Sequence, residues 1–142
     1  MSFPHWLMTL TVFCFLLLTG CGPPGLQPIH GKVTFAGGMP PQSEIAVIRF
    51  EPVEGSTLPE QFKVASGTIN PDGSYKLTTL DPDDGAYVGE YKVCFTIHKT
   101  YRGQESQIEP EFTKAATTPF TVKVERGGKR NFDFELKKAP GY

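Results

Sequence analysis

After residue 28, apolar and polar residues alternate along most of the chain with a period of two. Alternation of this kind predicts β-strands that bury one face. The clearest strand is expected at 87–100, where the apolar set is Tyr91, Val93, Phe95 and Ile97 and the polar set is Lys92, Cys94, Thr96 and His98. The pattern also predicts strands at 29–35, 62–66, 75–79, 120–124 and 132–136, and the apolar run at 44–50 predicts a strand covered on both faces. No stretch has the period of an amphipathic helix.

The segments between these strands are rich in turn-forming residues. The sequence NPDG at 70–73 predicts a turn, because Pro fixes φ and Gly accepts a positive φ. The sequence RGGK at 126–129 predicts a hairpin between the last two strands. Seven strands with such turns predict an all-β fold, an antiparallel seven-stranded β-sandwich. Its core is expected to contain nine aromatic side chains: Phe35, Phe50, Phe62, Tyr75, Tyr91, Phe95, Phe120, Phe132 and Phe134.

The first twenty residues differ in character from the rest of the chain. No Asp, Glu, Lys or Arg precedes Lys32, and residues 7–18 are apolar except for two threonines. This run is shorter than the ~20 apolar residues that cross a membrane. It fits the apolar core of a secretory signal, with small residues following it. We therefore expect residues 1–20 to be a signal peptide.

The sequence LTGC at 18–21, where the apolar run ends, resembles the lipobox of bacterial lipoproteins. In that family the signal is cut before the cysteine, which receives diacylglycerol on its thiol and an acyl chain on its amino group. The resemblance implies cleavage between Gly20 and Cys21 and a lipid bilayer anchor on Cys21, since two or three acyl chains hold a protein stably. The family's sorting rule makes Gly22 favour the outer membrane, facing the periplasm or the surface, over the inner membrane. An ordinary signal with a chance cysteine is the alternative.

The chain after the signal divides into three parts. Residues 22–28 read GPPGLQP, which forms neither a helix nor a central strand because Pro lacks an N–H donor, so residues 21–28 are an expected lipidated tether. Residues 29–138 are the expected β-sandwich domain, and residues 139–142 are a C-terminal tail. Cys14 would leave with the signal and Cys21 would be lipidated, so Cys94 is expected to have no disulfide partner.

Short motifs within the sandwich region resemble transthyretin-like, carboxypeptidase-regulatory-like domains, also called prealbumin-like. They follow one another in the order of that family: GKVTF and GGMP at 31–40, NPDGSY at 70–75, GAYVGEYKV at 85–93, TTPFTV at 117–122 and NFDFEL at 131–136. The resemblance covers about residues 31–136 and implies a prealbumin-like sandwich on an exported lipoprotein. It does not imply one activity, because fold does not determine function.

The sequence offers weak candidates for catalysis. The stretch YRGQ at 101–104 resembles the Tyr-Arg-Gly-Ser ending of transthyretin-related hydroxyisourate hydrolases, but it is internal and Gln replaces Ser. A polar loop with a solvated Arg102 is the simpler interpretation. Cys94 is expected to be a packed, inert thiol. Lys32 and Asn131 fall on the first and last predicted strands, an arrangement compatible with the Lys–Asn isopeptide bond of some related domains.

Metal ligands are equally sparse. Asp81, Asp83 and Asp84 lack the spacing of a twelve-residue Ca²⁺ loop, and Asp is common in turns. His30 and His98 lie on outward faces and have no partner at ligand spacing. We expect no metal, no cofactor and no catalytic residue.

The remaining features favour a binding or structural role. A formal net charge of -1 gives no general attraction to nucleic acid or to anionic lipid headgroups. The sequence predicts a non-enzymatic module that contacts an envelope protein or a glycan through an edge strand or the loops 51–60 and 100–116. A carbohydrate-binding module is the alternative, with Tyr87, Tyr101 and Tyr142 as aromatic candidates, and a small hydroxyisourate-type hydrolase is the third. Tyr87, Tyr101 and Arg102 are the candidate ligand-binding residues.

Overall fold

The computed structural model describes residues 25–55 and 64–142. The predicted signal peptide, Cys21 and Phe62 lie outside the described residues. The strands are β1 (Leu26–Gln27), β2 (His30–Phe35), β3 (Ile45–Pro52), β4 (Ala65–Thr68), β5 (Ser74–Lys76), β6 (Ala86–Tyr87), β7 (Gly89–His98), β8 (Thr121–Val124) and β9 (Phe134–Leu136). A short 3-10 helix, η2 (Pro110–Thr113), precedes β8. Within the described part, no helix has the length and apolar character needed to span a membrane.

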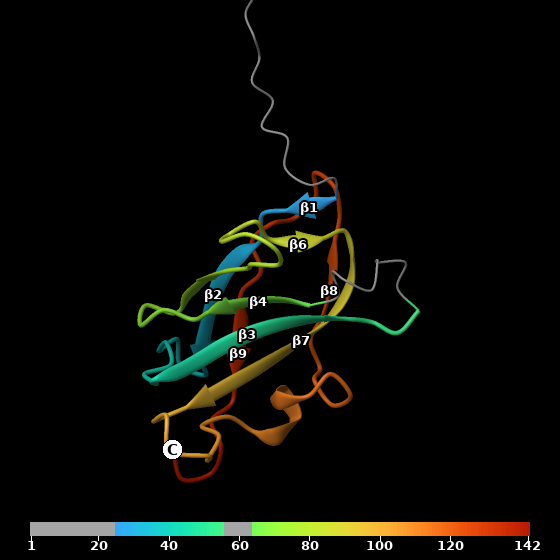
Figure 1. Ribbon diagram of the computed structural model, residues 1–142. Coiled ribbons are helices and arrows are strands. Elements are labelled where there is room, and N and C mark those ends of the chain that lie inside the picture. The colour runs from blue at the N-terminus through green and yellow to red at the C-terminus, as the bar shows by residue number, and fades with distance from the viewer. Residues whose placement is uncertain (1–24, 56–63) are drawn as a thin grey trace, which may run out of the picture.

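Two main sheets enclose one core (Figure 1). The first has the order β4-β3-β7-β8, and all of its pairs are antiparallel. The second has the order β5-β2-β9, in which β2 pairs antiparallel with β5 and parallel with β9. The strands β1 and β6 pair with each other at one end of the molecule. The prediction of an all-β fold built on antiparallel sheets is confirmed, with β2 and β9 as a parallel exception.

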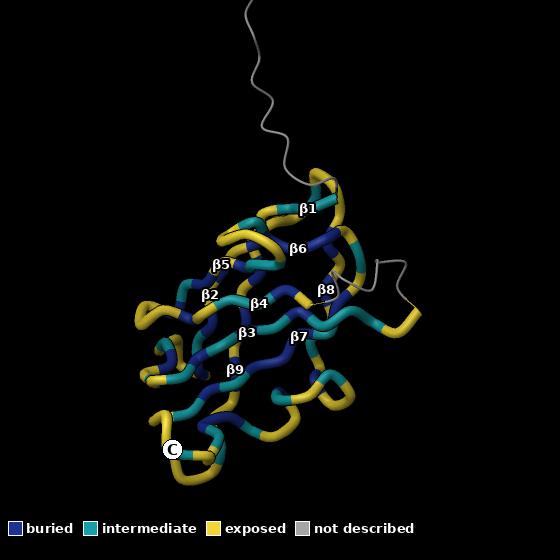
Figure 2. The backbone as a smooth tube through the Cα atoms, in the orientation of Figure 1, coloured by how far each residue is buried: buried dark blue, intermediate teal, exposed yellow. Residues whose placement is uncertain are grey.

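Buried residues of both sheets, dark blue in Figure 2, form one hydrophobic core. The alternation predicted for the long central strand is confirmed, because the apolar set of β7 is at most 1% exposed. Phe134 lies at the centre of the aromatic contacts, with ring centroids 5.1 Å from Phe120, 5.6 Å from Phe95 and 6.3 Å from Phe50. Burial of an aromatic side chain stabilises a fold by about 1.5–3 kcal/mol. These contacts therefore hold the two sheets together.

The number and limits of the strands differ from the prediction. Nine strands are present in the described residues, whereas seven were expected. The two additional strands are β1 and β6, whose two-residue length gives no alternation to detect. Leu26 and Gln27 belong to the predicted tether but pair with Tyr87 and Ala86, so the folded part begins earlier than residue 29. The start of the predicted tail is also attached to the domain, since the Ala139 N–H donates to the carbonyl group of Gln107.

Two local predictions are wrong. The turn at 126–129 does not close a hairpin, because β8 pairs with β7 in one sheet while β9 pairs with β2 in the other. The chain turns there to cross between sheets. The alternation of the predicted strand at 62–66 makes Phe62 and Val64 inward, but Val64 lies just before β4 and is 47% exposed, and Ala65, the first residue of β4, is buried instead. A shift of one residue reverses every side chain of a strand, because the period is two.

The β4–β5 connection closes one side of the sandwich. Ser66 and Thr78 exchange two backbone hydrogen bonds of 3.0 and 2.7 Å, which join the edge of one sheet to the edge of the other. The predicted turn at 70–73 makes this connection. Its Gly73 has φ of 86°, and the Gly73 N–H donates to the Asn70 carbonyl group over 2.8 Å. This turn prediction is confirmed.

The segment 106–120 closes the opposite side. The backbone of Gln107 donates to the carbonyl group of Ile97 at the end of β7 and accepts from Ala139 after β9. Phe112 of η2 is buried and stacks on Phe120 with ring centroids 5.6 Å apart. The expectation of a polar loop across residues 100–116 is therefore wrong for its second half, which covers the open edge of the core.

The sheet β5-β2-β9 depends on a close backbone contact at Gly31. A Cβ atom added to Gly31 would lie 1.9 Å from the carbonyl oxygen of Phe132, so no other residue fits there without displacement of the backbone. The same oxygen accepts a 2.7 Å hydrogen bond from the buried Tyr75 hydroxyl. The first Gly of the motif at 31–35 and the final Tyr of the motif at 70–75 thus meet at one carbonyl group.

Replacing Tyr75 with Phe should destabilise the protein by about 1–3 kcal/mol, because the Phe132 carbonyl group would lose a buried donor. Urea unfolding would measure the change. The matched control is Tyr101→Phe, which removes the same hydroxyl from a side chain that is 76% exposed, and which should change stability by less than about 0.5 kcal/mol. Equal effects of the two substitutions would show that the Tyr75 hydrogen bond is not important.

Candidate functional site

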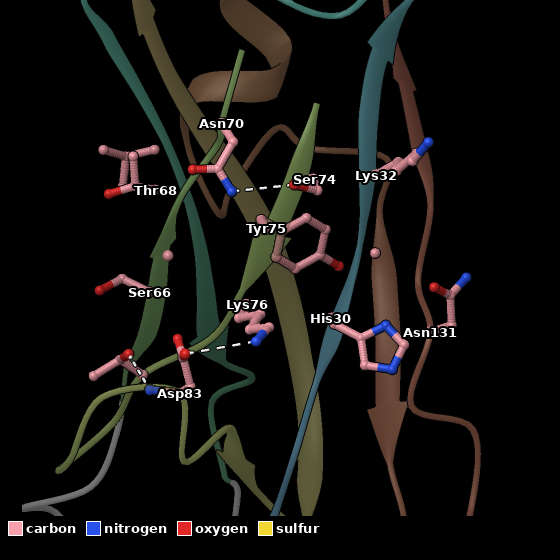
Figure 3. Close-up of a pocket in the computed structure, with 14 residues that line it drawn as sticks. His30, Lys32, Ser66, Thr68, Asn70, Ser74, Tyr75, Lys76, Asp83 and Asn131 are labelled. Atoms are coloured by element: carbon pink, nitrogen blue, oxygen red, sulfur yellow. Dashed lines mark hydrogen bonds and ion pairs between the residues drawn. The ribbon is translucent and has the colours of Figure 1, made fainter. Parts of the chain in front are cut away.

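A wide polar groove lies on the outer surface where the two sheets meet (Figure 3). It has a volume of about 880 Å³ and is open to solvent. Ser66 and Thr68 of β4 form one side, and His30 of β2 with the neighbouring Asn131 forms the other, with β5 between them.

The pairing of β2 with β5 sets the positions of the groove side chains. His30 lies opposite Lys76 and Lys32 lies opposite Ser74, so these four side chains project from one face. The parallel bridge between His30 and Asn131 adds the amide from the segment before β9. Because the inner faces of β2 and β5 carry the core, the outer faces are polar, as the alternation in the sequence requires.

Hydroxyl and amide groups dominate the groove. Ser66, Thr68 and Asn131 make no side-chain hydrogen bond to another described residue, so they are available to a ligand. Other groups already have partners: Asn70 Nδ2 donates to Ser74 Oγ over 3.1 Å. The ligand chemistry that fits is a neutral polar molecule with several hydroxyl or amide groups.

The charges of the groove are largely balanced. Lys76 Nζ lies 3.7 Å from Asp83 Oδ2, and both side chains are exposed, so this ion pair contributes little to stability. Lys32 lies near Asp72, whose pKa is lowered chiefly by hydrogen bonds from Ser74 and in a smaller part by the Lys32 charge. The groove therefore has no strong net charge.

The acidic segment 81–84 has a structural role in this fold. Asp84 Oδ1 accepts a hydrogen bond from the Thr79 N–H over 2.7 Å, and its Oδ2 accepts from Leu80 at 2.8 Å and Asp81 at 2.7 Å. The carboxylate thus fixes the loop before β6. Within residues 25–55 and 64–142, no group of three or more His, Cys, Asp or Glu side chains is placed to hold a metal ion.

The residues proposed from sequence as ligand contacts do not come together. Tyr87 is only 8% exposed, so the expectation of a surface ring at this position is not met. Tyr101 is 76% exposed, and Arg102 beside it is exposed too, both in the turn after β7. Tyr142 is 43% exposed and donates to Glu105 Oε2. None of these four side chains lines the polar groove.

Cys94 lies on the outer face of β7, as expected, but it is fully buried. Burial raises the pKa of the thiol to about 11, the Glu51 charge adds to the increase, and Arg49 and Lys92 oppose it. At neutral pH the sulfur is therefore a protonated thiol, which is a weak nucleophile. Arg49 finds partners near it, donating to Thr96 Oγ1 over 2.8 Å and pairing with Glu51 at 3.3 Å.

Lys32 and Asn131 both line the groove and are exposed. An isopeptide bond between them would require buried surroundings with a carboxyl group that assists the reaction. The exposure of both side chains therefore disfavours this hypothesis.

A second, smaller pocket of about 350 Å³ lies at the end of the sandwich away from β1 and β6. Met39, Pro40, Lys99 and Tyr142 are among the residues that line it. Met39 is 66% exposed, which makes this pocket more apolar at its rim than the groove.

Neither alternation nor a motif predicts the groove, because its lining comes from six separate segments whose polar side chains are ordinary surface residues in each of them. Comparisons of the chain with models of protein families, with curated proteins and with solved structures found no match.

Replacing Asp84 with Asn should reduce stability at neutral pH by about 1–2 kcal/mol, because one acceptor oxygen becomes an NH₂ group that faces backbone donors. Burial raises the pKa of this carboxyl, but the hydrogen bonds from Asp81, Thr79 and Leu80 outweigh it and leave the pKa below its ordinary 3.8. Because the pKa is lower in the folded than in the unfolded state, the ionised Asp84 carboxylate stabilises the fold at higher pH. This stabilisation is lost as the pH falls through the folded pKa.

Urea unfolding of the unchanged protein and of Asp84→Asn, between neutral and acidic pH, would measure the difference in their free energies of unfolding. It should be constant above about pH 5 and shrink below about pH 4. Asp81→Asn is the control, since no hydrogen bond to the Asp81 carboxylate is present among the described residues. A difference that grows on acidification would contradict the assignment.

Proposed function

We propose that this protein is an exported, membrane-anchored lipoprotein with one transthyretin-like β-sandwich, acting as a non-enzymatic binding or structural module of the cell envelope. The observation that carries the proposal is the position of Cys21. It follows an apolar run at a lipobox-like LTGC sequence, and the first strand, β1, begins at Leu26, five residues later. A lipid attached to a cysteine between an export signal and a domain would hold that domain at the membrane surface.

The polar groove supports the binding role. It is preformed by backbone pairing, it is open, and several of its polar side chains lack partners among the described residues. The partner class is an envelope protein or a glycan, and the outer membrane is the favoured location because Gly follows the cysteine.

Cys21→Ala should abolish lipidation, block cleavage of the signal and change how the protein partitions with membranes, because the acyl chains have no other attachment point in the proposal. Metabolic labelling with a radioactive fatty acid, combined with mass determination, would test it. Cys14→Ala is the matched control and should leave labelling intact. Fatty acid incorporation into the Cys21→Ala protein would contradict the lipoprotein assignment.

A carbohydrate-binding module is the second candidate, and the lining of the groove favours it. Sugar hydroxyl groups form hydrogen bonds readily with side chains such as those of Ser66, Thr68 and Asn131, each of which can both donate and accept. Stacking on an exposed aromatic ring, the other common means of sugar binding, is offered by Tyr101 outside the groove. The hydroxyisourate-type hydrolase stays the third candidate.

A glycan array probed with the protein and two variants would separate these sites. We expect Asn131→Ala to lose at least tenfold in affinity for any glycan bound in the groove, and Tyr101→Ala to bind it unchanged. The reverse result would place the site in the turn after β7, and an absence of binding to every glycan would exclude the carbohydrate alternative.

A further inference from the structure

A cluster of basic residues lies at the end of the domain where the chain enters from the proposed anchor. Its members are Arg126, Lys129 and Arg130, all exposed, in the turn between β8 and β9. The Gly127 N–H donates to Gln27 Oε1 over 3.3 Å, which attaches this turn to β1. The Arg130 carbonyl group accepts from the His30 N–H over 3.0 Å, which fixes the other end of the turn to the start of β2.

Among the described residues, this basic turn is the outermost feature at its end of the domain. In Figure 1 the orange-red turn projects beyond β1 and β6, next to the point where the described chain begins. Figure 2 shows the same turn as exposed. The end of the sandwich with the C-terminus and the turn after β7 lies on the far side.

The charges of the turn are not neutralised locally. Arg126 and Arg130 have no carboxylate within ion-pair distance among the described residues, and Lys129 Nζ lies 5.1 Å from the centre of the Phe132 ring. Glu125, which precedes the turn, is paired with Lys123 at 3.1 Å. The cations are therefore free to meet an external anion.

Acidic groups at the same end offset this charge only in part. Gly85 packs against Gln27, which brings the segment 81–84 close to β1. Within it, Asp83 pairs with Lys76, and Asp84 is directed at backbone N–H groups of its own loop. Asp81 is the acidic side chain of this segment with neither kind of partner among the described residues.

The length of chain between Cys21 and Gly25 limits how far this end can lie from a bilayer. Four residues span at most about 14 Å when fully extended. The Debye length at physiological ionic strength is about 8 Å, so only groups near the anchored end come within electrostatic range of lipid headgroups. The turn at 126–130 is attached to Gln27, two residues after Gly25, and therefore lies at the anchored end of the domain.

We propose that the turn at 126–130 is a docking surface for anionic phospholipid headgroups, which holds the sandwich upright on its membrane with β1 and β6 at the lipid surface. This inference rests on the lipid anchor of the proposed function. A polybasic segment beside an acyl anchor adds membrane affinity, with a contribution of roughly fivefold for each Lys or Arg close to an anionic surface. Here it would set orientation, since the anchor alone allows the domain to tumble.

Hydrogen exchange on the full lipidated protein in vesicles tests this directly. On vesicles of phosphatidylcholine with phosphatidylglycerol, amides of residues 125–130 should exchange severalfold more slowly than on phosphatidylcholine alone. High salt should remove the difference, because screening weakens the contact. Amides of residues 99–106, at the far end, should be unaffected by lipid charge.

Two charge-reversed variants provide the matched comparison. Arg126→Glu combined with Lys129→Glu and Arg130→Glu should abolish the protection, whereas Lys99→Glu, Arg102→Glu and Lys137→Glu, with the same change in net charge, should keep it. Protection that is equal on both vesicles, confined to 99–106, or insensitive to the first variant would overturn the docking surface. Mass determination of the attached acyl groups is independent of these outcomes, so failure of the anchor is distinguished from failure of docking.

Discussion

The contact between Gly31 and the carbonyl group of Phe132 determines how the second sheet is built. The absence of a side chain at Gly31 lets β2 approach the segment before β9 closely, and the Tyr75 hydroxyl binds the same oxygen from β5. Three segments far apart in the chain thus meet at one buried polar group, which cannot lose its donor without cost. The parallel pairing of β2 with β9, the position of Phe134 in the core and the bridge from His30 to Asn131 all follow from this arrangement.

The same contact explains which parts of the fold were predictable. Alternation along β2 and β7 is a local property of the sequence, so the inward residues of both strands were correctly assigned. The sheet to which β9 belongs depends on Gly31 and Tyr75, both distant in sequence, and local turn chemistry at 126–129 favoured a hairpin instead. Val64 was assigned inward because alternation alone does not fix register when a strand is as short as β4.

The candidate site was less predictable than the fold for a physical reason. Catalytic and metal sites require unusual residues at fixed spacings, but the polar groove uses Ser, Thr, Asn and Lys at outward positions, where such residues are common. The aromatic side chains that sequence reasoning favoured include Tyr87, which the β1–β6 pairing encloses. Two-residue strands carry no detectable period, so the burial of Tyr87 could be known only from tertiary structure.

The orientation of the domain would link the proposed lipid anchor to the polar groove and to the pocket beside Met39. If the basic turn at 126–130 meets the lipid surface, the groove opens sideways, because it lies on the outer faces of β2, β4 and β5 rather than at an end of the sandwich. Its ligand would then approach parallel to the membrane, as a neighbouring envelope component does. The pocket beside Met39 and Tyr142 would face away from the bilayer, together with the exposed Tyr101. An upright domain therefore presents two different surfaces, a polar one to its neighbours in the membrane plane and a more apolar one to the space beyond, and a domain free to tumble would present neither consistently.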